Sequence, residues 1–198
     1  MAVLRLRRLL GDATLLWVSD GRVGLDAERA SSDVQQRRKL IEQVESMAMR
    51  SSGHDAGHTT QAECLALVER VIAFSRGELL PGLASAPWLD AERQRCRNDT
   101  VRAALAAATV TERLQVGPLE RELLETALRI EPLAESLVRR LMHAHERAGQ
   151  RGDALRVYES YRQQLQRCGA KPGEQIEAQW RAVLAQPPHA VKTATPAP

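Results

Sequence analysis

Apolar side chains recur at steps of three and four residues from Leu137 to Leu165, which places them on one face of each of two helices. The pattern is interrupted only at Gly149-Gln150-Arg151-Gly152. A connection this short forces the second helix back alongside the first. The sequence therefore predicts a helical hairpin over residues 137–165. Four charged side chains of its first helix are predicted to point into solvent: Arg139, Arg140, Glu146 and Arg147.

The turn of this hairpin carries further signals. Gly149 can adopt the left-handed conformation that ends a helix, and Asp153 is predicted to cap the helix that follows. Ala154 is small enough to let the two helices approach closely, and Tyr158 and Tyr161 follow at helical spacing. A glycine, a small residue and two aromatic residues in this order resemble the tetratricopeptide repeat.

A second copy of the pattern precedes the first. The helical pattern of residues 119–128 ends at Glu131-Pro132, as the later copy ends at Lys171-Pro172. Alignment of the two copies places Glu120 at the position of Ala154. It also pairs two apolar residues with the two tyrosines: Leu124 with Tyr158, and Ala127 with Tyr161.

The remaining helical patterns cover residues 33–49, 61–76, 88–111 and 174–184. The last of these is predicted to cover the final apolar face, because a stack of helical hairpins needs such a lid. Residues 50–60 and Gln186 to Pro198 have no apolar period, so we expect an exposed loop and a disordered tail. Aromatic residues make up only 3% of the chain and good helix formers dominate it. The predicted fold class is all-α, an array of tetratricopeptide-like hairpins.

The first 27 residues have a different pattern. Residues 4–10 are typical of the last turns of a helix, which Gly11 would end. Two partly β-branched runs, 15–18 and 22–25, flank Ser19-Asp20-Gly21, and Asp-Gly tolerates the positive φ of a tight hairpin. A helix followed by a β-hairpin is the end of a winged-helix unit. The alternative is a hairpin that simply packs on the helical body, since an isolated hairpin is marginally stable.

Charge and cysteine content narrow the class of protein. The net charge of +3 is mild and the charged residues are interspersed, which favours solvated helix faces over a nucleic-acid stripe. The three cysteines are odd in number and far apart, as expected for reduced thiols in a cytoplasmic protein. No apolar run is long enough to cross a membrane. We expect a soluble cytoplasmic protein with no membrane partner.

The sequence predicts neither an enzyme nor a cofactor site. Gly77 and Gly82 lack the spacing and the lysine of a phosphate-binding loop. His54, His58 and Cys64 have a spacing that could hold zinc on a helix, but the glycines between them break that helix, so no metal is expected. Acidic residues are abundant and are predicted to be surface charges.

Two segments resemble a known family. Gly77-Glu78-Leu79-Leu80-Pro81-Gly82-Leu83 and the stretch from Trp88 to Arg95 look like the signature of the bacterial transcriptional activator domain. This tetratricopeptide-like domain follows the winged-helix domain in transcription regulators of the antibiotic-regulatory-protein type. Residues 6–11 and 20–23 resemble the tail of the recognition helix and the wing of the same family. The resemblance covers residues 4 to 184.

The resemblance implies three parts. Residues 1–27 would be a partial winged-helix tail, residues 33–185 the activator domain and residues 186–198 a tail. In the family three helices precede the wing, and Met1 falls inside the recognition helix, so we expect DNA reading to be largely lost. Four arginines would then make weak, non-specific contacts with DNA phosphates: Arg5, Arg7, Arg8 and Arg22. A second departure is Ser31-Ser32-Asp33-Val34, where the family usually places an aromatic residue after the wing.

The expected function is regulatory. The resemblance implies a domain that relays a signal or assembles partners through a concave groove, with a protein or an adjacent regulator domain as partner and a homodimer as a further option. The groove is predicted to be lined by four residues: Arg139, Arg140, Tyr158 and Arg162. The alternative for Tyr158 and Tyr161 is a packing role in the core. The alternative function is a stand-alone repeat adaptor unrelated to transcription.

Overall fold

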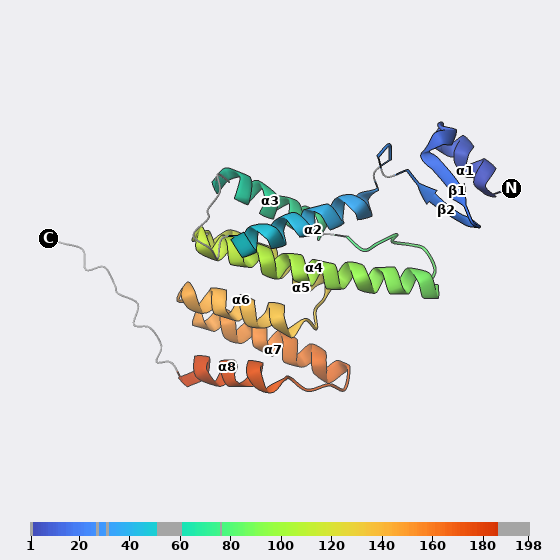
Figure 1. The fold of residues 1–198 in the computed structure, drawn as a ribbon. Coiled ribbons are helices and arrows are strands. Elements are labelled where there is room, and N and C mark those ends of the chain that lie inside the picture. Colours follow the sequence, from blue (N-terminus) through green and yellow to red (C-terminus); the bar gives the residue numbers. More distant parts are fainter. Residues whose placement is uncertain (1, 27, 31, 51–60, 76, 186–198) are drawn as a thin grey trace. The chain divides into compact units, whose positions relative to one another are not determined.

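The computed structural model describes residues 2–26, 28–30, 32–50, 61–75 and 77–185 (Figure 1). The predictions for His54, for His58 and for the tail from Gln186 to Pro198 lie outside the described residues. The chain divides into two compact units, Met1–Lys39 and Leu40–Pro198. The division falls within one helix, α2 (Asp33–Arg50). The first turns of α2 therefore belong to the N-terminal unit and the remainder to the helical unit.

The N-terminal unit contains the predicted helix end and β-hairpin. Its elements are α1 (Ala2–Leu10), a 3-10 turn (Ala13–Leu15), β1 (Leu16–Ser19) and β2 (Arg22–Leu25). The two strands are antiparallel, with Trp17 opposite Gly24. Asp20 and Gly21 have φ angles of 50° and 71°, which a two-residue turn between twisted strands requires. The predicted Asp-Gly hairpin is confirmed.

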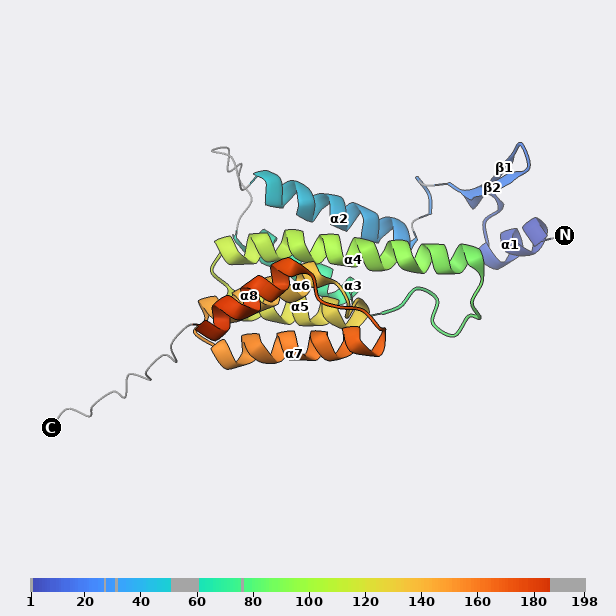
Figure 2. The ribbon, with the colours of Figure 1, turned by 90° about the horizontal axis from the view of Figure 1, so that it is seen from below.

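The helical unit consists of consecutive antiparallel helices. After α2 these are α3 (Gln61–Phe74), α4 (Pro87–Arg113), α5 (Gly117–Ile130), α6 (Glu135–Arg147), α7 (Arg151–Arg167) and α8 (Glu174–Ala185). Each helix from α3 to α8 packs on the next, and α4, α6 and α8 also contact one another in succession. The helices from α4 to α8 run side by side in both views (Figures 1 and 2). The all-α array predicted from the periodicity is confirmed.

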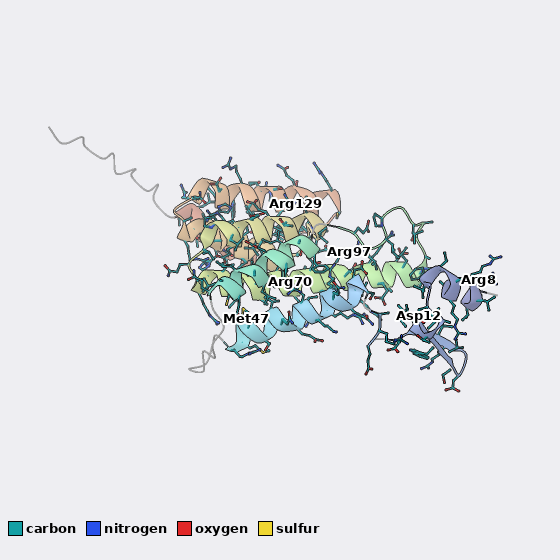
Figure 3. The ribbon with its side chains drawn as sticks, turned by 90° about the horizontal axis from the view of Figure 1, so that it is seen from above. Arg8, Asp12, Met47, Arg70, Arg97 and Arg129 are labelled. Atoms are coloured by element: carbon teal, nitrogen blue, oxygen red, sulfur yellow. The ribbon has the colours of Figure 1, made fainter. Side chains whose placement is uncertain are left out.

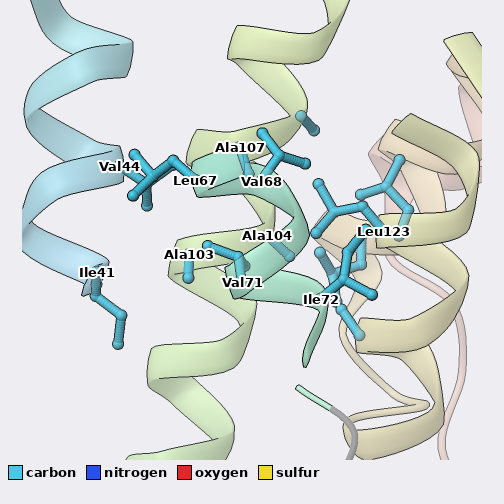
Figure 4. Packing of buried hydrophobic residues seen from close by; sticks show 14 of the residues in the cluster. Ile41, Val44, Leu67, Val68, Val71, Ile72, Ala103, Ala104, Ala107 and Leu123 are labelled. Atoms are coloured by element: carbon cyan, nitrogen blue, oxygen red, sulfur yellow. The ribbon is translucent and has the colours of Figure 1, made fainter. Parts of the chain in front are cut away.

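The larger of two apolar clusters joins helices α2 to α6. Branched side chains of α2 and α3, among them Val44 and Val68, face the alanines of α4 (Figure 4). Ala104 and Ala107 are fully buried, so the neighbouring helices approach α4 closely and leave no room for a longer side chain.

The smaller apolar cluster holds the last three helices together. Tyr158 of α7 is 1% exposed, and its ring stacks on Trp180 of α8 with centroids 5.0 Å apart. Arg151 fastens the end of α8, because its guanidinium donates to the carbonyls of Val183 at 2.8 Å and Leu184 at 2.9 Å. Helix α8 thus covers the final apolar face of the array, as a terminal lid must.

The turn before α7 differs in one detail from the prediction. Gly149 has a φ of 70° and ends α6, as expected. Gln150 is the N-cap of α7 and makes no capping bond through its side chain. Asp153 lies in the first turn, where it pairs with Arg156. The predicted cap by Asp153 is wrong, because the N-cap of α7 is three residues earlier, at Gln150.

Candidate functional site

Helices α4, α6 and α8 line a cavity of about 500 Å3, which we call the α6 groove. Most of its lining comes from one face of α6, with one residue each from α4 and α8. The polar lining side chains surround a single apolar one, Leu105. The lining residues are Leu105, Ser136, Arg139, Arg140, His143, Glu146 and Gln179. The arrangement brings together two of the four predicted groove residues, Arg139 and Arg140.

The other two predicted residues lie elsewhere. Tyr158 is buried between α7 and α8, and its hydroxyl donates to Glu177 Oε1 at 3.1 Å. Burial, and then this carboxylate, raise the pKa of Tyr158 to about 12. Arg162 lies on α7 outside the groove and pairs with Glu159 at 3.7 Å. The placement of Tyr158 on a groove surface is therefore corrected, because Trp180 and α8 cover its ring.

Arg139 enters the groove with part of its hydrogen-bonding capacity unused. One terminal nitrogen donates to Gln175 Oε1 of α8. Its Nε is buried and has no hydrogen-bond partner within the described residues. A buried donor without an acceptor costs free energy, and no carboxylate of the described residues pairs with this guanidinium.

Arg140 belongs to a ring of four alternating charges that joins α4, α5 and α6. Glu120 of α5 is fully buried, and its Oε1 lies 3.0 Å from Arg140 Nε while its Oε2 binds Arg147. Glu112 of α4 lies 2.6 Å from Arg140 and 2.7 Å from Arg147. The two carboxylates balance the two guanidinium groups, so a charged group can be buried here.

The sequence did not predict this ring. Arg140 and Arg147 were expected to point into solvent, and the glutamates were counted as surface charges. Both expectations are wrong for these residues, because the arginines of α6 turn toward α4 and α5 instead. Arg147 also donates to His143 Nδ1 at 2.7 Å. A guanidinium only donates, so His143 accepts at Nδ1 and presents its other nitrogen as the donor.

A second cavity of about 500 Å3 lies on the opposite face of α6, between α5 and α7. Its floor is apolar and includes Leu128, Val138, Leu141 and Val157. Charges of both signs stand along its lining, with Glu125 and Arg129 on α5. Of the two cavities, only the α6 groove is lined by residues that were predicted for a partner groove, Arg139 and Arg140.

The predicted phosphate-contacting arginines differ in exposure. Arg5, Arg8 and Arg22 are exposed on α1 and β2 (Figure 3 labels Arg8). Arg7 is half-buried, and its guanidinium donates to the carbonyl of Leu16 at 3.2 Å. Arg7 therefore ties α1 to the hairpin of its own unit, while the side chains of the other three arginines are exposed.

Within the described ranges, no three His, Cys, Asp or Glu side chains gather closely enough to hold a metal ion.

Among the helices that the structure describes, none has the length and apolar character that crossing a bilayer requires.

The segment with the family signature is held by one arginine. Arg93 of α4 donates to the carbonyls of Leu79 at 3.1 Å, Leu80 at 2.9 Å and Leu83 at 3.3 Å. These bonds fix the Gly- and Pro-rich turn against the start of α4. Leu80 has a φ of 49°, a strained angle for a leucine, which the three bonds help to hold.

Comparison with known proteins gives one family. A search of curated proteins found no match. The model of the bacterial transcriptional activator domain matches residues 42–184. This range includes α3 to α7, half of α2, most of α8 and every residue that lines the α6 groove. The match covers well over half of the chain, and it begins close to the start of the helical unit at Leu40. The chain therefore belongs to the family of bacterial transcriptional activator domains.

Proposed function

We propose that this chain is the regulatory domain of a bacterial transcription regulator and that it binds a partner protein in the α6 groove. Family membership supports the regulatory role. The carrying observation is the groove itself, a polar cavity of about 500 Å3 lined by three alternate helices of the array, α4, α6 and α8. The partner is a separate protein or an adjacent regulator domain, and the site of action is the cytoplasm, where bacterial DNA is transcribed.

The groove has the rigidity that recognition needs. Arg140 lines it and is held from behind by Glu112 and Glu120, so α4, α5 and α6 keep a fixed spacing. Gln179 of α8 donates to the carbonyl of Arg139 and to Glu146 Oε2, both at 3.2 Å, which fixes the other wall. A groove whose walls are fixed before binding loses less conformational entropy when a partner enters.

The test fills the groove in the intact regulator. Ser136 is exposed in the groove, so Ser136→Trp should block it without disturbing the core. In a reporter strain, we expect transcription from the regulated promoter to fall to the level of a strain without the gene. Thermal unfolding of the purified variant should match the parent, which separates blocking from misfolding.

The matched control is Gln163→Trp, an equally bulky change at an exposed position of α7 that lines neither cavity. This variant should activate as the parent does. Full activation by Ser136→Trp would contradict the proposed partner site. Normal transcription in a strain that lacks the whole gene would instead favour the stand-alone adaptor.

A further inference from the structure

Arg139 is the one cation in the α6 groove whose charge is not balanced by a carboxylate of the described residues. One of its terminal nitrogens donates to the neutral amide of Gln175, and its Nε has no acceptor among the described residues. Arg140, one residue further, is already paired with Glu112 and Glu120. Among the lining residues, Arg139 is therefore the cation to which a carboxylate of a ligand can bind.

The two ends of the groove have opposite character. Ser136 and Arg139 stand at one end of the lining face of α6, and Glu146 stands at the other. Ten residues separate Ser136 from Glu146, which corresponds to about 15 Å along a helix. An extended peptide covers this distance with about five residues. The groove is thus long enough for a short segment and basic at only one of its ends.

We propose that the α6 groove binds an acidic segment of the partner protein, with a carboxylate of that segment on the guanidinium of Arg139. The proposal rests on the groove being the partner site. An arginine guanidinium binds a carboxylate through charge-assisted hydrogen bonds, and Arg139 lines the groove without a carboxylate partner among the described residues. Ser136 adds a hydroxyl donor one turn earlier.

Glu146 gives the bound segment a direction. A second carboxylate near Glu146 would be repelled, so the acidic residue of the segment must lie toward Ser136 and a neutral or basic residue toward Glu146. Leu105 is the only apolar side chain of the lining, so hydrophobic burial contributes little to recognition. Electrostatic contacts of this kind weaken as salt is added.

The experiment uses the full chain and a hexaglutamate peptide as probe. The side-chain Nε–H resonance of Arg139 is followed by nuclear magnetic resonance as the peptide is added. We expect this resonance to shift with hexaglutamate and not with hexaglutamine or with inorganic phosphate. An equal shift with phosphate would overturn the proposal, because the site would then take any small anion.

Three variants test whether hexaglutamate binding depends on the charged side chains of the groove. Arg139→Gln should weaken hexaglutamate binding at least tenfold, which corresponds to about 1.4 kcal/mol. Arg162→Gln removes the same charge from α7 outside the groove and should leave binding unchanged. Glu146→Gln should strengthen binding, which a damaged fold cannot do. Equal weakening by Arg139→Gln and Arg162→Gln would overturn the proposal, since only general charge would then matter.

The two proposals fail in different ways. If Ser136→Trp abolishes transcription but Arg139 does not respond to hexaglutamate, the groove is the partner site and the acidic ligand is wrong. If hexaglutamate binds at Arg139 but Ser136→Trp leaves transcription intact, the acidic site exists and the regulatory role of the groove is wrong.

Discussion

Glu120 of α5 and Arg140 of α6 form an ion pair in which the carboxylate is completely shielded from solvent and the Oε1 to Nε distance is 3.0 Å. Arg147 binds the second oxygen of the same carboxylate. Helices α5 and α6 belong to successive hairpins of the array, so this contact fixes how one hairpin stands on the next. It also holds Arg140 in place in the wall of the α6 groove.

Replacement of Glu120 by glutamine should strongly destabilise the helical unit. The change leaves Arg140 and Arg147 with only Glu112 as a carboxylate partner. Breaking a buried ion pair by removing one partner costs about 3 to 5 kcal/mol, and the partial exposure of both arginines favours the lower end. Urea denaturation measures the loss. Glu159→Gln breaks an exposed pair with Arg162 and should cost about 1 kcal/mol or less. Equal costs would contradict the role of burial.

The position of Glu120 was predictable, but its chemistry was not. The repeat alignment gives Glu120 the position that Ala154 has in the later copy, and both residues are fully buried. A glutamate at a helical position nevertheless suggests a surface charge, because most glutamates are exposed. The arginines that neutralise it are 20 and 27 residues further along the chain. Which of many arginines meets a buried acid depends on helix packing, and periodicity carries no such information.

The sequence also predicted the candidate site only in part. Helical periodicity identified the polar face of α6 and thus Arg139 and Arg140. Tyr158 lies on α7, and whether its ring is covered depends on where α8 returns across the array. The ring that covers Tyr158 belongs to Trp180 of α8, and the sequence alone does not place the two rings together.

Replacement of Ala154 by leucine should lower the melting temperature. Ala154 is fully buried in the smaller apolar cluster, where α7 approaches α6. Additional methylene groups at such a close helix crossing typically cost about 1 to 3 kcal/mol. Calorimetry gives the size of the effect. Ala182→Leu adds the same atoms at an exposed position of α8 and should leave the melting temperature nearly unchanged. A neutral Ala154→Leu would count against the close packing of this repeat.

Stability should decrease at alkaline pH because of both tyrosines. Burial, and then Glu135, raise the pKa of Tyr161 to about 12, and Tyr158 is raised to about 12 as well, from an ordinary value of 10.0. The folded chain therefore keeps protons that the unfolded chain releases between these values. The stabilisation is complete below pH 10 and is lost as the pH rises through about 12.

Denaturation curves measured across this range should show the decrease in the free energy of unfolding. The chain has only two tyrosines, so the absorbance of tyrosinate measures the ionisation of Tyr158 and Tyr161 only. The double variant Tyr158→Phe, Tyr161→Phe should lose most of the pH dependence even if it is less stable throughout. An unchanged alkaline slope in the double variant would assign the effect to other groups.

Arg5, Arg8 and Arg22 should give this chain weak DNA binding that depends on salt and not on base sequence. Each phosphate contact contributes about 0.9 to the slope of the logarithm of affinity against the logarithm of salt concentration. Replacement of all three arginines by glutamine should therefore lower the slope by up to about 2.7. The matched control replaces three arginines of the helical unit by glutamine, Arg156, Arg162 and Arg181, and should leave the slope nearly as it was.

The sequence specificity is measured by fluorescence anisotropy with a promoter duplex and with a random duplex. The two duplexes should give coinciding curves, because phosphate contacts carry no base information, and a tenfold preference for the promoter would mean that other side chains read the bases.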